Sequence, residues 1–147
     1  DAVRLTAAHP LAQSVGLHIT HAATGASLFF LGGLTRQVRN LPDPPPSVDV
    51  LALPLTQNSE WWLDDAVGLI LLLWPRVVLV HHHDDWCPPL TRRVDVAGFR
   101  HTVEERCGVP VFEPSLGATF TLEDLLGVAK RNSQRPQQAP RAGRSNG

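Results

Sequence analysis

The chain has 147 residues, of which 43% are hydrophobic, with 13 basic and 14 acidic side chains and a formal net charge of −1. This length and composition suit one soluble globular domain and argue against a strongly basic nucleic-acid binder. The longest apolar run, Ala66 to Trp74, is far too short to span a membrane. We therefore expect a cytoplasmic protein with no membrane segment.

The basic residues are concentrated at the carboxyl end. Residues 130–147 contain five basic side chains and no acidic one, which leaves eight basic and fourteen acidic residues before them, a charge of −6. This segment has almost nothing to bury, so we predict a folded domain over residues 1–129 and a disordered basic tail over residues 130–147. The tail contains no aromatic residue, which argues against a nucleic-acid partner.

The first half of the chain predicts strands joined by turns. We expect short strands over residues 2–6, 16–20 and 26–31, the last two forming a hairpin. Alternation within the second strand puts Leu17 and Ile19 on one face and His18 on the other, so we expect His18 to be exposed. The proline-rich residues 41–46 can form neither a helix nor a central strand and must cross the surface.

The middle of the chain predicts a parallel pair of strands. A strand over residues 48–55 leads to a helix over 61–74, which Pro75 ends, and then to a strand over 76–80. Farther on we expect a helix over 96–107 capped by Gly108, and short strands over 109–112 and 117–121. Thr121 and Asp124 resemble a capping box that starts a last helix through about Lys130. The two cysteines, Cys87 and Cys107, give no disulfide framework.

A cluster of polar side chains follows the strand over residues 76–80, at a position where active sites are common. It consists of His81, His82, His83, Asp84 and Asp85. Imidazole binds zinc and other late divalent ions, and a carboxylate can complete the ligand shell or orient a histidine ligand. If the extended backbone continues, His81 and His83 share one side and His82 takes the other, so all three should not bind one ion. The other interpretation is a polar loop with solvated histidines.

The order of these features resembles the C-terminal half of the metallo-β-lactamase fold superfamily over about residues 5–128. The resemblance rests on three features of the first part of the chain. They are a histidine followed by a strand of the pattern Val-Gly-Leu-x-Ile, within residues 9–19, a hairpin strand ending in glycine, and the segment Asp49 to Pro54. The resemblance continues with Trp74 to Trp86 and with Val109 to Leu122. It implies half of an αββα sandwich, an α+β (α/β) fold with a mixed sheet flanked by helices. Such a half exposes an apolar sheet face and should need a partner, which is either the missing N-terminal half or a second copy.

The resemblance also implies metal ligands. His9 corresponds to the family's third metal-binding histidine and His82 to its last, with one or two zinc ions in the complete fold. Asp84 or Asp85 would orient a ligand or close the pocket. Two departures stand out: Gly33 occupies the position of a bridging aspartate, and the family's His-x-His-x-Asp-His signature is absent. His81 to Trp86 fits that signature in part, and under this alternative His81 and His83 would be ligands instead of His82.

The activity implied is hydrolysis of a small-molecule substrate by a metal-bound hydroxide. A catalytic zinc needs about three protein ligands, so we expect this half to be inactive without its N-terminal counterpart. The chain begins with Asp1 rather than Met, and we expect that sequence precedes it. The alternative is a non-catalytic module derived from this fold that serves interaction or structural metal binding. The sequence does not select among lactams, thioesters, phosphodiesters and lactones as substrates.

Overall fold

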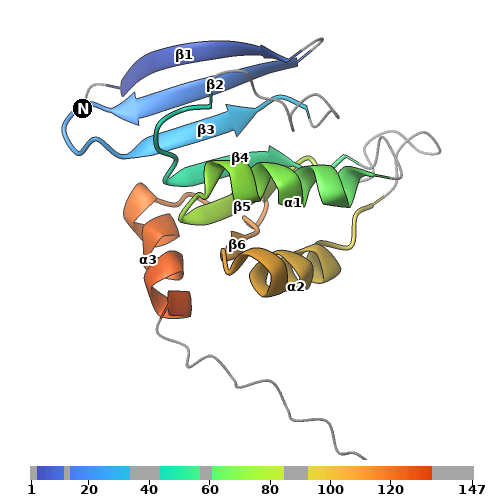
Figure 1. Ribbon diagram of the computed structural model, residues 1–147. Helices are drawn as coiled ribbons and strands as arrows, with labels where there is room; N and C mark the ends of the chain where they lie inside the picture. Colours follow the sequence, from blue (N-terminus) through green and yellow to red (C-terminus); the bar gives the residue numbers. More distant parts are fainter. Residues whose placement is uncertain (1–2, 12–13, 34–43, 57–60, 85–92, 134–147) are drawn as a thin grey trace, which may run out of the picture.

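The computed structural model of the protein describes residues 3–11, 14–33, 44–56, 61–84 and 93–133. They form a six-stranded sheet, in the order β1-β2-β3-β4-β5-β6, and three helices (Figure 1). The strands are β1 (Val3–Leu11), β2 (Ser14–His21), β3 (Ser27–Leu31), β4 (Val50–Pro54), β5 (Val77–His81) and β6 (Val111–Phe112). The helices are α1 (Trp62–Leu73), α2 (Val96–Cys107) and α3 (Leu122–Ser133). The mixed sheet flanked by helices confirms the predicted α+β class.

The sheet joins an antiparallel half to a parallel half. β1, β2 and β3 pair antiparallel, and the predicted hairpin between β2 and β3 turns at Gly25, which has a φ of 71°. β3, β4, β5 and β6 pair parallel to one another. The carboxyl ends of these four strands therefore lie along one edge of the sheet.

The β4–α1–β5 unit forms as predicted, with β4 and β5 as parallel neighbours. α1 ends at Trp74, whose left-handed φ of 46° closes the helix through a hydrogen bond from its backbone N–H to the carbonyl of Ile70. Pro75 follows and cannot continue the helix. The chain then returns directly into β5, so the segment after β5 lies at the same edge as the end of β4.

One face of the sheet is sealed by α1 and α2. The central side chains on this face are fully buried: Phe29, Leu31, Leu51, Leu53, Val78 and Val80. They pack with apolar residues of α1 and α2 in one cluster. His18 is on this face too, paired across from Phe29, and only 7% of it is exposed. The prediction of an exposed His18 was wrong, because the chain near Ser47 covers it and the Ser47 carbonyl lies 3.2 Å from its Nε2.

The opposite face is only partly covered. α3 packs against the amino-terminal ends of β4 and β5, where Leu125 buries Val50 and Val77. Phe30, near the carboxyl end of β3, remains 36% exposed, and Leu17 and Ile19 of the neighbouring β2 are half-buried on the same face. This face is apolar but lacks a second layer over its carboxyl-terminal part among the described residues.

The end of the chain corrects one predicted strand. Residues 117–121 form no strand, because Gly117 turns with a φ of 74° and Ala118 N–H donates to the Ser115 carbonyl. Phe120 instead packs edge-on against Phe112, with ring centroids 5.3 Å apart. The predicted capping box of α3 is confirmed. Thr121 N–H donates to Asp124 Oδ2 at 2.8 Å, and Asp124 N–H donates to Thr121 Oγ1 at 3.1 Å.

α3 continues to Ser133, past the predicted limit of the folded domain at residue 129. Most of the predicted tail, residues 134–147, lies outside the described residues. Among the residues that the structure describes, no helix is both long enough and apolar enough to cross a membrane.

Candidate metal centre

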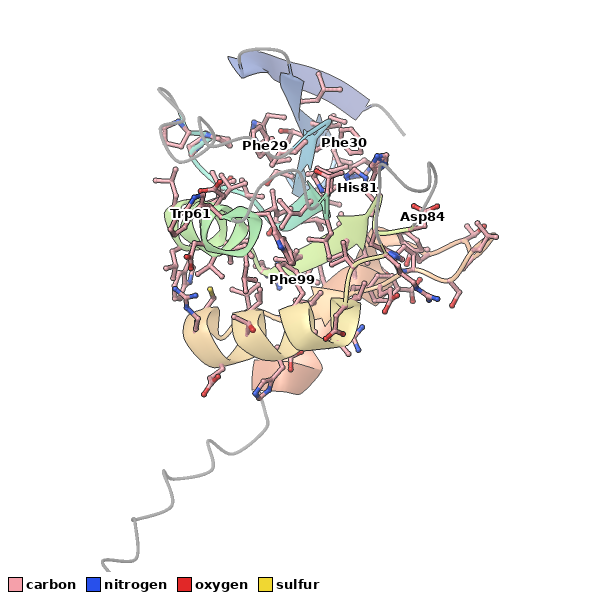
Figure 2. The ribbon with its side chains drawn as sticks, turned by 90° about the vertical axis from the view of Figure 1, so that its right-hand side faces the viewer. Phe29, Phe30, Trp61, His81, Asp84 and Phe99 are labelled. Atoms are coloured by element: carbon pink, nitrogen blue, oxygen red, sulfur yellow. The ribbon has the colours of Figure 1, made fainter. Side chains whose placement is uncertain are left out.

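The candidate site lies where the parallel strands end, and Figure 2 shows His81 beside Phe30, with Asp84 farther out. β5 delivers His81 to this edge, and the backbone N–H of Leu55, just after β4, donates to the His81 carbonyl at 2.9 Å. Two neighbouring strands therefore fix the point from which the polar segment His81 to Asp84 leaves the sheet.

His81 is held on the partly covered face. Its ring stacks on Phe30, with centroids 5.0 Å apart and an interplanar angle of 11°. Its Nε2 atom is buried and has no hydrogen-bond partner among the described residues. Burial lowers the pKa of His81 below its ordinary value of 6.5; the neighbouring His82 and, less strongly, His83 act the same way, while the carbonyls of Leu31 and Ala52 oppose the shift. The geometry favours a neutral ring with an available nitrogen.

His82 leaves the strand geometry altogether. Its φ is 55°, a left-handed value that is uncommon for a residue other than glycine, and its side chain is exposed. The extended backbone expected through His83 therefore ends at His81. Such backbone outliers cluster at functional sites, where surrounding structure maintains them.

His83 lies against different elements. Its Nε2 is 3.9 Å from Oε1 of Glu113, which follows β6, and its carbonyl accepts a hydrogen bond of 3.1 Å from the backbone N–H of Val94, before α2. Glu113 also pairs with Arg100 of α2 at 3.4 Å. His81 packs on β3, whereas His83 is directed to β6 and α2. The backbone turn at His82 thus separates two side chains that the alternation placed together.

The remaining candidates are only partly described. His9 is in β1, paired with Gly16 of β2, but nothing of its side chain is described. β2, β3 and β4 separate β1 from β5, so four strand spacings, roughly 19 Å in a flat sheet, lie between the strands that carry His9 and His81. Asp84 is exposed, and Asp85 lies outside the described residues. Gly33 is half-buried at the end of β3 and supplies no carboxylate there.

These residues do not form a complete metal site. Within the described ranges, no group of three or more His, Cys, Asp or Glu side chains is arranged to hold an ion. The histidines at this edge offer single ligands in different directions, whereas a zinc centre needs three or four that converge. The described residues alone therefore support no metal-dependent step.

Comparison with known proteins places the fold. No family model matches the sequence, and no curated protein matches it. The structure is similar to Igni18, a metallo hydrolase from the hyperthermophilic archaeon Ignicoccus hospitalis, with a TM-score of 0.53 and 21% identity over 80% of this chain. It also matches a protein from Parabacteroides distasonis, provisionally described as a metal-dependent hydrolase, with a TM-score of 0.48 and 15% identity over 67% of this chain.

The chain spans 51% of the length of the first structure and 39% of the length of the second. Its fold is metallo-β-lactamase-like over the part that it covers, which confirms the resemblance predicted from the sequence. At this level of identity the likeness concerns the fold alone.

Sequence reasoning missed two contacts at the site. Alternation along the segment Leu28 to Leu31 puts the side chains of Phe29 and Phe30 on opposite faces of the sheet. It does not tell which of the two rings contacts His81. Glu113 is thirty residues beyond His83 in the chain, and no local pattern predicts their contact. Both contacts depend on how β5 is placed between β4 and β6.

Proposed function

We propose that this chain is one half of a zinc-dependent hydrolase and contributes histidine ligands to a metal site that residues outside it complete. The observation that carries the proposal is the position of His82. It directly follows a central parallel strand, at the edge where this metallo-β-lactamase-like fold presents its polar residues, and its left-handed backbone separates it from both neighbouring histidines. His82 is therefore the first ligand that we assign.

The remaining roles follow from the fold and from chemistry. His9 is the second ligand in this proposal, which requires the sheet to twist and curve so that β1 comes closer to the end of β5 than four flat strand spacings allow. Asp84 or Asp85 would orient a ligand or border the substrate. A bound zinc would supply a hydroxide at neutral pH and polarise the bond under attack. This half holds too few ligands for that chemistry, so we expect no hydrolysis of esters or phosphodiesters by the chain alone.

The partly covered sheet face supports the need for a second half. Leu17, Ile19 and Phe30 are apolar and incompletely buried, as expected for a surface against which another layer packs. His81 stacks on Phe30 at the carboxyl-terminal end of this face. In this proposal, a layer that covered the face would reach the histidine edge as well and would bring the missing ligands to it.

Zinc affinity tests the proposal. We would titrate zinc into the metal-free chain against a chromophoric chelator and compare the His82→Ala and His9→Ala variants. His101→Ala is the matched control, because His101 is an exposed histidine in the middle of α2 and is not part of the segment His81 to Asp84. We expect about one zinc per chain and at least a tenfold loss of affinity in both ligand variants, with no change in the control.

The outcomes separate the assignments. A loss in His82→Ala alone would retain the site and remove His9 from it. A loss in His81→Ala and His83→Ala, with His82→Ala unchanged, would favour the alternative ligand pair. Equal affinity in all variants would contradict the proposal.

A second candidate function is a non-catalytic module for interaction or structural metal binding. Gly33 favours it, because the position at the end of β3 holds no carboxylate to bridge two ions. The two functions differ in one result. The hydrolase proposal requires activity when the chain is joined to an upstream half that carries the His-x-His-x-Asp-His signature, and the module requires none.

A further inference from the structure

The left-handed turn at His82 is fixed on both sides by other elements of the fold. Before it, the His81 carbonyl accepts a hydrogen bond of 2.9 Å from the backbone N–H of Leu55. After it, the His83 carbonyl accepts one of 3.1 Å from the backbone N–H of Val94. A residue other than glycine stays left-handed only when its surroundings determine its backbone, and these two bonds supply part of that constraint.

A row of charged side chains adds a third constraint. Glu113, which follows β6, lies between His83 and Arg100 of α2: its Oε1 is 3.9 Å from Nε2 of His83, and its Oε2 accepts a hydrogen bond of 3.4 Å from Nη2 of Arg100. The side chains of His83, Glu113 and Arg100 are 22%, 36% and 39% exposed, so solvent screens these contacts less than it screens a fully exposed pair. The carboxylate favours the ring tautomer of His83 that carries its proton on Nε2.

Both ends of the Arg100–Glu113 pair belong to the packed part of the molecule. Arg100 directly follows Phe99, which is buried in the core between α2 and the sheet, and the Nε atom of Arg100 is itself buried. Glu113 directly follows Phe112, which pairs with Leu79 of β5. The carboxylate that faces His83 is therefore anchored to a helix and to a strand.

We propose that Glu113, held by Arg100, is a positioning residue for His82. It restrains His83 and with it the turn from which the His82 side chain projects. This inference rests on the proposed function, in which His82 is a zinc ligand. A ligand whose backbone is already fixed loses less conformational entropy when it binds an ion. Removal of the restraint should therefore weaken zinc binding although no ligand is removed.

Glu113→Gln tests the proposal in the full chain, because it removes the charge and keeps the shape of the side chain. Glu105→Gln is the matched control, since Glu105 also lies 3.9 Å from a histidine, His101, but at an exposed site on α2. Two quantities are measured in each variant. The first is zinc affinity against a chromophoric chelator. The second is the NOE between the amide and α protons of His82 in metal-free protein, which is strong only while φ is positive.

We expect zinc affinity to fall at least threefold in Glu113→Gln and the His82 NOE to weaken, whereas Glu105→Gln should match the wild-type chain. Arg100→Gln should act in the same direction. The double variant should bind zinc no more weakly than Glu113→Gln alone, because both residues act through one contact. Urea unfolding checks that each variant is folded, and if Glu113→Gln is not, Arg100→Gln decides.

The outcomes distinguish this inference from the proposed function. If the wild-type chain binds zinc through His82 and Glu113→Gln binds it equally well, the positioning role is overturned while the ligand stands. If the wild-type chain binds no zinc, the proposed function fails, and the NOE alone then decides whether Glu113 holds the turn. An NOE that Glu113→Gln leaves unchanged overturns the inference in either case. An equal loss of zinc affinity in Glu105→Gln overturns it as well.

Discussion

The two faces of the central sheet differ in what covers them. Beneath α1 and α2, Phe29 is completely buried, whereas its neighbour Phe30 on the opposite face is 36% exposed and stacks on His81. The first face forms a fully packed hydrophobic core with helices of this chain. The second has α3 at its amino-terminal end only and leads to the histidine edge at the other. Stability therefore resides mainly on one face, and the candidate chemistry lies at the margin of the other.

The largest expected effect is a difference in stability between variants of the two adjacent phenylalanines. Phe29→Ala should lower the free energy of unfolding by about 3–5 kcal/mol, because it opens a cavity in a fully packed cluster. Phe30→Ala removes a ring that solvent already reaches and should cost about 1–2 kcal/mol. Urea unfolding of both variants measures the difference. Equal losses would show that the second face is as completely packed as the first.

A smaller effect is expected from the cap of the helix on the second face. Thr121→Ala removes the hydroxyl that accepts from Asp124 N–H, and should cost about 1 kcal/mol. Thr119→Ala is the matched control, since Thr119 is exposed just before the helix. Hydrogen exchange should accelerate in α3 but not in α1 or α2. Faster exchange in α1 as well would mean that the two faces unfold together.

The smallest effect concerns His81 in metal-free protein. Its pKa lies below 6.5 chiefly because burial disfavours the charged ring, so the unfolded chain takes up this proton first as the pH falls. Stability should decrease as the pH falls from 6.5 to the lowered pKa and should be unaffected by this residue above that window. Phe30→Ala exposes the ring and should move its pKa back toward 6.5. Histidine NMR titration with a chelator present measures both values, and an unchanged pKa would mean that Phe30 does not shield the ring.

Local signals in the sequence predicted the elements well. Gly108 ends α2, and Thr121 with Asp124 starts α3, because each signal acts within a few residues. The signals failed where the outcome depended on distant segments. His18 is buried because a segment near Ser47 covers it, and residues 117–121 contribute Phe120 to packing instead of forming a strand.

The sequence predicted which residues make up the candidate site, but it did not predict how their side chains are arranged. The histidine and aspartate cluster was evident from its place after an apolar strand. The left-handed turn at His82 was not, because alternation assumes that the strand continues. Nor could sequence show that His81 stacks on Phe30 while His83 approaches Glu113, since these contacts join strands far apart in the chain.

The most direct test of the account is to observe the histidine rings by nitrogen NMR while zinc is added to the metal-free chain. The account predicts that the ring signals of His82 and His9 shift together, that His81 responds weakly through its neighbour, and that His18 and His101 do not move. His18 is buried on the fully packed face and His101 is exposed on α2, so they report non-specific effects. If His81 and His83 shift while His82 does not, or if no ring responds in folded protein, the assignment of the metal to His82 at this edge is contradicted.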